Sequence, residues 1–188
     1  MNAVENVGRA YARIAASGRP DVWITLRPER DALAAARSID KRTARGEELP
    51  LPGMTVAVKD NIDVAGMDTT AACPSFAYPA DADAEVVARL TAAGAIVLGK
   101  TNMDQFATGL VGTRSPHGVV ADARRPEYVS GGSSSGSAVA VALGHVDLAL
   151  GTDTAGSGRV PAAFQGIFGI KPTRELVPTT GVVPASPT

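Results

Sequence analysis

Two turns rich in glycine and serine lie close together in this chain, at residues 131–137 and 151–159. A single run of this composition is typical of a flexible linker. Here both runs are bounded by apolar segments, which argues against a linker. Glycine lets the backbone approach a ligand closely, and a serine hydroxyl becomes a nucleophile when a base removes its proton. The two turns are therefore interpreted as parts of one folded site.

Lys59 is the candidate base for such a serine. It follows an apolar stretch at 54–58 and precedes the polar pair Asp60 and Asn61. A lysine at the end of a buried strand is desolvated, which lowers its pKa from roughly 10.4 and makes the neutral amine available. The residues alone leave two interpretations open, a surface lysine or a catalytic base.

Composition narrows the class of protein. The chain has 188 residues, 45% hydrophobic and 20% charged, as expected for one globular domain with a core. Its net charge of -1 gives no field for a nucleic-acid or membrane partner. No apolar run reaches the roughly 18 residues that span a bilayer. Cys73 is the only cysteine, and the first residues have no signal-peptide pattern. The sequence therefore predicts a cytoplasmic protein.

The two histidines, His117 and His145, are too few for a His-rich metal site. The sequence predicts neither a metal nor a cofactor, and both histidines are interpreted as structural. Cys73 fits either a small buried apolar side chain or the thiol of a Glu-Lys-Cys amide hydrolase with Lys59. The pattern G-x-S-x-G occurs at 132–136, but no acidic residue lies between Ser134 and His145 to complete a Ser-acid-His triad.

Hydrophobic periodicity predicts an α/β fold, a mixed β-sheet core flanked by helices. Asp81 or Asp83 is expected to cap the third helix, and Asn102 with Gln105 to form a capping box that opens a further short helix. Residues 1–48 form an N-terminal helical segment in this interpretation, and 49–188 a larger body that looks cut inside a domain. The expected helices are 2–16, 29–45, 84–93 and 135–144, and the expected strands 54–58, 95–98, 147–150 and 167–170.

Four short segments, taken together and in order, resemble the amidase signature family: 58–61, 99–102, 131–137 and 151–157. The resemblance runs from about residue 50 to 187. It implies the amidase-signature fold and hydrolysis of linear amides by a Ser-cisSer-Lys triad without a cofactor. Ser157 matches the family's nucleophile, Ser133 the bridging serine that follows a cis peptide bond, and Lys59 the terminal base. The backbone N–H groups of Thr154, Ala155 and Gly156 match the family's oxyanion hole.

Within the family, segments 22–25, 103–116 and 157–164 are most similar to the allophanate hydrolases. Those proteins cleave allophanate (urea-1-carboxylate) to ammonia and carbon dioxide during urea degradation. The resemblance implies that Gly109 lies beside a small amide substrate, while Arg159 fits either a ligand of the substrate's carboxylate or a structural residue. One departure is Glu175, where the subfamily usually has glycine; a positive φ there would cost about 1 kcal/mol.

Two alternatives stay open. The chain could be another family member, either a general amidase or the A subunit of a glutamyl-tRNA amidotransferase. It could instead be a catalytically inactive fragment, because amidase signature domains run to well over twice this length. The missing half would carry further strands and the side chains that hold the substrate's carboxylate. The expected partner is therefore that remainder of the domain or a second copy of the chain.

Overall fold

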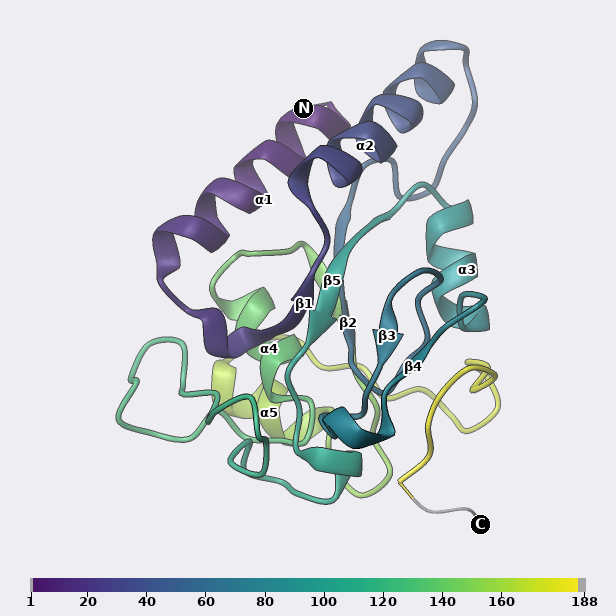
Figure 1. Ribbon diagram of the computed structural model, residues 1–188. Helices are drawn as coiled ribbons and strands as arrows, with labels where there is room; N and C mark the ends of the chain where they lie inside the picture. The colour runs from purple at the N-terminus through teal and green to yellow at the C-terminus, as the bar shows by residue number, and fades with distance from the viewer. Residues whose placement is uncertain (1, 186–188) are drawn as a thin grey trace.

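A computed structural model describes residues 2–185 and builds them around one mixed sheet (Figure 1). The strand order is β1-β5-β2-β6. The bounds are Trp23–Leu26 for β1, Thr55–Lys59 for β2, Ile96–Thr101 for β5 and Leu148–Leu150 for β6. The strand β2 pairs in parallel with both β5 and β6, while β1 runs antiparallel to β5. The mixed sheet predicted from the sequence is confirmed.

The alternation of side chains along β2 divides the core between the two faces of the sheet. Ala57 packs with residues of α1, α2 and α4, whereas Val56 and Val58 pack with Val87 of α3 on the other face. Every residue of β2 and β5 is buried, which explains why both strands read as continuous apolar runs. Burial of each valine stabilises the fold by roughly 1.5–3 kcal/mol.

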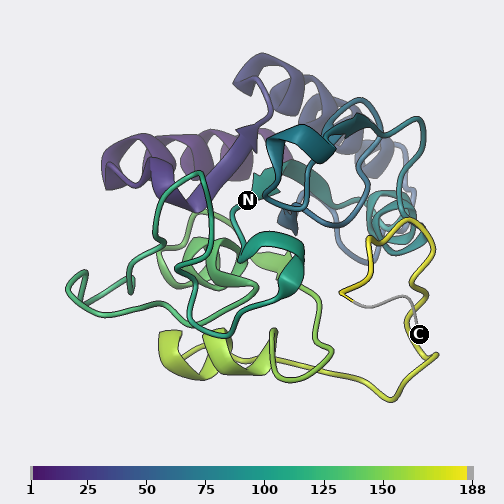
Figure 2. The same cartoon turned by 60° about the horizontal axis from the view of Figure 1, so that its bottom comes forward.

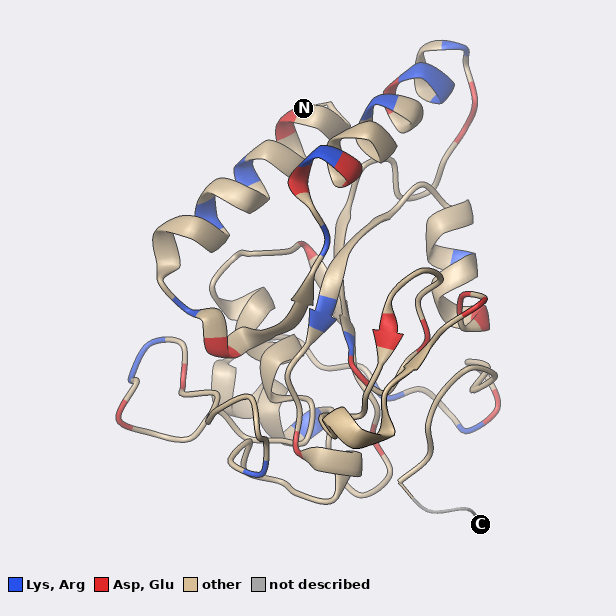
Figure 3. Cartoon of the chain, viewed as in Figure 1, with Lys and Arg blue, Asp and Glu red and all other residues tan. Residues whose placement is uncertain are grey.

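The first two helices, α1 (Ala3–Ser17) and α2 (Glu29–Ala44), pack against each other and against the sheet in the same core cluster as Ala57. A capping box between Asn2 and Glu5 starts α1, and Gly18 in the left-handed region ends it. Asp40 of α2 accepts the free N–H groups of Ala3 and Val4. Both helices were predicted within two residues. Basic and acidic residues are interspersed along them (Figure 3).

Residues 1–48 contribute more than helices, because β1 is an edge strand of the main sheet. The sequence pattern did not predict β1. Three of its four residues, Trp23, Ile24 and Leu26, are apolar, but the strand is short and all four residues are only half-buried. The domain boundary after residue 48 stays a prediction.

The helix α4 (Ser135–Ala142) carries the first serine turn against the sheet. A Cβ at Gly136 would lie 2.4 Å from the carbonyl oxygen of Val22 and 2.7 Å from the nitrogen of Asn102. Only glycine permits this approach of helix to backbone. The small residues of this helix predicted close packing. That close packing brings the turn at 131–134 to the end of β5.

Three local predictions were wrong. The helix α3 (Glu85–Ala92) begins at Ala84 without a side-chain cap, because Asp83 instead accepts from the N–H of Ala65. Asn102 caps no helix: it is fully buried, and its amide donates to the carbonyls of Asp21 and Gly118. Residues 167–170 form no strand, and Phe168 and Ile170 stand exposed without a partner strand in the described chain.

The remaining elements are short. The C-terminal segment returns to α3, where the N–H of Glu85 donates to the carbonyl of Thr180 (Figure 2), and further along it the N–H of Val183 donates to the carbonyl of Asn61 after β2. Glu175 adopts φ 71°, the strained conformation considered from the sequence. No described helix is long and apolar enough to cross a membrane. The short elements are η1 (Pro20–Val22), β3 (Asp68–Thr69), η2 (Pro74–Phe76), β4 (Tyr78–Pro79), η3 (Gln105–Ala107) and α5 (Arg159–Gln165).

Candidate active site

The candidate site lies where the carboxyl ends of β2, β5 and β6 meet. Lys59 is the last residue of β2, Thr152 follows β6 closely, and Ser133 precedes α4. Parallel strands bring their carboxyl ends to the same edge of a sheet, and ligands of α/β proteins bind preferentially there. Residues far apart in sequence therefore converge at this edge.

Lys59 is completely buried, and its Nζ lies 2.7 Å from Ser133 Oγ. A second oxygen, Thr152 Oγ1, lies 2.7 Å from the same nitrogen. Burial removes water from the ammonium and lowers the pKa of Lys59 to about 7, although the carboxylates of Asp104 and Asp153 act in the opposite direction. A substantial fraction of Lys59 is therefore a neutral amine near pH 7, as proton uptake requires.

The first serine turn is fixed by its backbone. The peptide bond between Gly132 and Ser133 is cis, in agreement with the family resemblance. The N–H of Asp104 donates to the carbonyl of Ser133 at 3.1 Å, and the N–H of Gly132 donates to that of Leu110 at 2.9 Å. A Cβ on Gly132 would lie 2.2 Å from Asp104 Oδ2, so only glycine fits above this carboxylate.

The second turn places Ser157 beside the first. The N–H of Ser134 donates to the carbonyl of Ser157 at 3.0 Å, and Ser157 is only 5% exposed. Within residues 2–185 the hydroxyl of Ser157 makes no hydrogen bond. The structure thus joins Lys59 directly to Ser133 and joins Ser157 to that pair through the backbone alone.

Asp153 organises the loop before Ser157. Its carboxylate accepts the backbone N–H groups of Gly156, Gly158 and Arg159, and also binds the guanidinium of Arg159. These bonds, led by that of the Arg159 side chain, hold the pKa of Asp153 well below its usual range. Asp153 is therefore ionised at neutral pH and keeps the loop folded around it.

The predicted oxyanion donors divide into two kinds. The N–H groups of Thr154 and Ala155 make no hydrogen bond within the described residues. The N–H of Gly156 donates to Asp153 Oδ1 at 2.8 Å. Two of the three groups are thus open to bind an anion in this conformation.

The two predicted substrate residues lie in different surroundings. Gly109 sits against Asp104, where a Cβ would come within 2.5 Å of Oδ2, on the same carboxylate that supports Gly132. Arg159 is the first residue of α5 and ion-pairs with Asp153 at 2.9 Å. Its guanidinium is therefore already engaged by a carboxylate of the protein.

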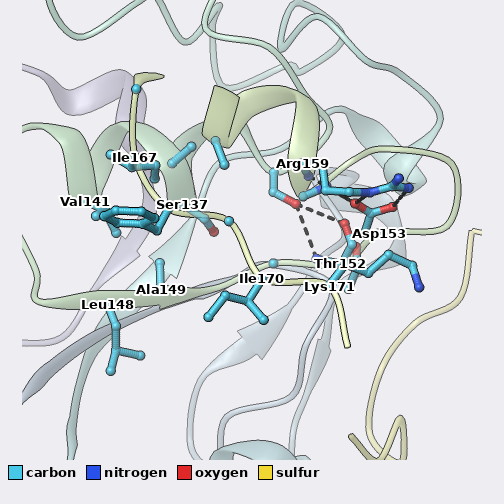
Figure 4. A pocket seen from close by; sticks show the side chains of 18 of the residues that line it. Ser137, Val141, Leu148, Ala149, Thr152, Asp153, Arg159, Ile167, Ile170 and Lys171 are labelled. Carbon is cyan, nitrogen blue, oxygen red and sulfur yellow. Dashed lines mark hydrogen bonds and ion pairs between the residues drawn. The ribbon is translucent and has the colours of Figure 1, made fainter. Parts of the chain in front are cut away.

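An open groove of about 590 Å³ borders the site on one side (Figure 4). Thr152, Asp153 and Arg159 line its polar end, and Val141 and Ile170 belong to its apolar part. Lys59, Ser133 and Ser157 do not line it. The groove lies beside the three residues rather than over them.

Two residues of the site were missed from the sequence. The carboxylate of Asp104 lies against Gly132 and accepts the N–H groups of Gly112 and Arg114 from the loop after η3. Thr152 contacts Lys59. Asp104 and Thr152 both follow apolar strands by only a few residues, the same signal that selected Lys59. His145, by contrast, is buried beside Trp23, and burial lowers its pKa to about 4.

A sequence model of the family described as Amidase matches residues 5–188. The chain belongs to the amidase family. It is 57% identical to the urea amidolyase of Saccharomyces cerevisiae over 88% of the chain and 9% of that protein. It is 49% identical to the A subunit of the glutamyl-tRNA(Gln) amidotransferase of Symbiobacterium thermophilum, over 97% of the chain and 38% of that relative.

Solved amidase structures share the fold. The structure of Kluyveromyces lactis allophanate hydrolase superposes with a TM-score of 0.83 and 45% identity, over 98% of this chain and 30% of that one. The predicted amidase-signature fold is therefore confirmed for this chain. The chain spans well under half the length of each of these three relatives.

Proposed function

We propose that this amidase-family chain carries the catalytic residues of an amide hydrolase, with Ser157 as nucleophile, Ser133 as proton relay and Lys59 as base. The observation that supports this most is the 2.7 Å contact between the buried Lys59 amine and the Ser133 hydroxyl. A buried lysine without a paired carboxylate is costly to the fold. Its pKa of about 7 suits a base that works near neutral pH.

In this mechanism Ser157 Oγ attacks the amide carbon while its proton passes to Ser133, and the proton of Ser133 passes to Lys59. The carbonyl π electrons move onto oxygen. When the tetrahedral intermediate collapses, the C–N bond breaks and the leaving nitrogen takes a proton from Ser133, which Lys59 replaces. Water then attacks the acyl-enzyme by the same proton path and releases Ser157.

The oxyanion is bound in this proposal by the backbone N–H groups of Thr154 and Ala155, joined by Gly156 once it leaves Asp153. Each donor aimed at the developing charge contributes about 3 kcal/mol to the transition state. Asp153 keeps the loop in place through Gly158 and Arg159. Gly109 is proposed to line the substrate position, and Arg159 to lie at its edge.

Allophanate is the proposed substrate, with ammonia and carbon dioxide as products in urea degradation. The identity of 57% to a urea amidolyase and the likeness to an allophanate hydrolase support this choice. A glutamyl-tRNA amidotransferase activity is the second candidate, supported by the 49% identity to one such enzyme. The net charge of -1 favours the small substrate over tRNA.

The proposed setting is the cytoplasm, on the basis of the single cysteine. The proposed partner is either the remaining part of an amidase domain or a second copy of this chain. Phe168 and Ile170, which line the groove and are exposed, support a contact there.

The test is ammonia release by the purified protein with allophanate, malonamate, biuret and simple amides. We expect allophanate to have the highest kcat/KM. A preference for simple amides would overturn the substrate, while glutaminase activity that depends on charged tRNA would favour the second candidate. No release from any of them, with no labelling of Ser157 by a serine-directed probe, would identify an inactive fragment.

A further inference from the structure

Lys59 has two oxygen neighbours, and the proposed relay uses only one of them. Thr152 Oγ1 lies 2.7 Å from Nζ, the same distance as Ser133 Oγ. The two hydroxyls come from different segments, since Ser133 precedes α4 and Thr152 follows β6. Thr152 therefore contacts the base from outside the serine pair.

Asn61 determines which role the Thr152 oxygen takes. The amide nitrogen of Asn61 donates to the carbonyl of Val183 at 3.0 Å and to Thr152 Oγ1 at 3.3 Å. Because a carbonyl can only accept, the Asn61 nitrogen must face Val183. This orientation leaves Asn61 Oδ1 buried without a partner. Thr152 Oγ1 thus receives a donor from Asn61 and is set to accept from Lys59 as well.

We propose that Thr152 is a positioning residue of the proton relay, whose oxygen accepts a hydrogen bond from the Lys59 ammonium that forms when the serine pair releases its proton. The proposal rests on the relay described above. An ammonium in a dry site needs acceptors, and Ser133 Oγ and Thr152 Oγ1 are its two hydrogen-bond partners within residues 2–185. Thr152 thereby makes Lys59 a stronger base and holds Nζ near Ser133.

The charges around Lys59 are the same in the wild type and in the variant that tests the Thr152 hydroxyl. Asp104, after β5, and Asp153, after β6, are the carboxylates that act on Lys59, and both favour its charged form. The adjacent Asp60 pairs with Lys100 of β5 at 3.5 Å. A Thr152→Val change alters none of these charges and nearly preserves shape, so it isolates the hydroxyl.

The experiment measures the pH dependence of Ser157 acylation by a serine-directed covalent probe, in wild type, Thr152→Val and Thr152→Ser. Without the acceptor, the ammonium is less stable and Lys59 takes up a proton less readily. We expect Thr152→Val to lower the plateau rate by about 10- to 100-fold, the loss of one hydrogen bond to a charged group. We also expect the midpoint of its profile to move to lower pH. Thr152→Ser keeps the oxygen and should restore both.

A purely structural role predicts something different. It would lower the plateau by reducing the amount of folded protein and leave the midpoint in place, and that result overturns the proposal. Thr152→Ala, which adds no atoms, is measured in parallel. The urea unfolding midpoint of each variant shows whether Thr152→Val has a fold defect. Lys59→Met could abolish the wild-type pH profile while the Thr152 variants keep the wild-type rate and midpoint. That result would reject the role of Thr152 and retain the relay. A wild-type protein that the probe does not acylate would reject both.

Discussion

The two serine turns are built differently, although they look alike in sequence. Ser133 and Ser134 of the first turn are almost fully buried, and the Ser133 hydroxyl contacts Lys59. In the second turn Thr154 and Ala155 are exposed, and the hydroxyl of Ser157 is unbonded within the described residues. The first turn is held by the sheet and by Asp104, the second chiefly by the carboxylate of Asp153.

This difference fits the two tasks that we propose for the turns. A proton relay works at fixed distances in a dry site, and desolvation lowers the pKa of Lys59 to about 7 so that a neutral amine is available there. A nucleophile and its oxyanion donors must face the substrate, and unbonded N–H and O–H groups are what the substrate would engage. Rigid support therefore belongs to the relay and accessible donors belong to the nucleophile.

The largest expected effect comes from removing the nucleophile. Ser157→Ala should lower turnover by about 10⁴-fold or more, because the acyl-enzyme can no longer form. The measurement is ammonia release together with labelling by the serine-directed probe. Ser75→Ala is the matched control, since among the described residues the hydroxyl of Ser75 has a hydrogen bond with Cys73 alone. Full labelling of Ser157→Ala would assign the nucleophile to another residue.

Glycine replacement tests whether the first turn is the more rigid one. A Cβ on Gly136 meets backbone atoms at 2.4 and 2.7 Å, so Gly136→Ala should destabilise the protein by about 1–3 kcal/mol. A Cβ on Gly151 meets only the side chain of Ser134, with Oγ at 2.8 Å, and should cost less than about 1 kcal/mol. Urea unfolding measures both.

Gly8→Ala is the control, since apart from the chain neighbours and backbone of its own helix no atom of the described residues lies within 4 Å of its Cβ position in α1. It should stabilise the protein by about 0.5–1 kcal/mol. Equal losses for Gly136→Ala and Gly151→Ala would remove the distinction between the turns.

The smallest expected effect on Ser157 acylation concerns the support of the second turn. Asp153→Asn replaces one acceptor oxygen by an amide, which cannot satisfy the N–H groups of Gly156, Gly158 and Arg159 together. We expect Ser157 acylation to slow by about tenfold and stability to fall by about 1–3 kcal/mol. Asp81→Asn, on an exposed turn, is the control. An Asp153→Asn protein with wild-type acylation would show that the loop holds its shape without the carboxylate.

Much of the fold could be predicted because the core strands are continuous apolar runs. The runs around β2, β5 and β6 gave strands close to their observed bounds. Residues 167–170 have the same composition but no partner in the described chain, and strand formation requires pairing that one segment cannot report. The strand β1 was missed because a run of four residues is too short to tell a strand from a loop by composition, although three of the four are apolar.

The site was predictable only in part. The family resemblance supplied Lys59, Ser133 and Ser157, and the observed contact between Lys59 and Ser133 joins residues 74 positions apart. The roles of Thr152 and Asp104 depend on which side chains meet across the sheet edge. The residues on either side of Thr152, a glycine and an aspartate, do not indicate that its hydroxyl contacts Lys59, 93 positions away.

The most direct test of the relay is the pH dependence of Ser157 acylation in wild type and Lys59→Met. Only neutral Lys59 accepts a proton, and its pKa is lowered to about 7. The wild-type rate should therefore rise as pH increases through about 7 and level off above it, and the Lys59→Met rate should be lower by about 10³-fold or more and lack this rise. A Lys59→Met protein that is acylated at the wild-type rate with the same pH profile would contradict the account.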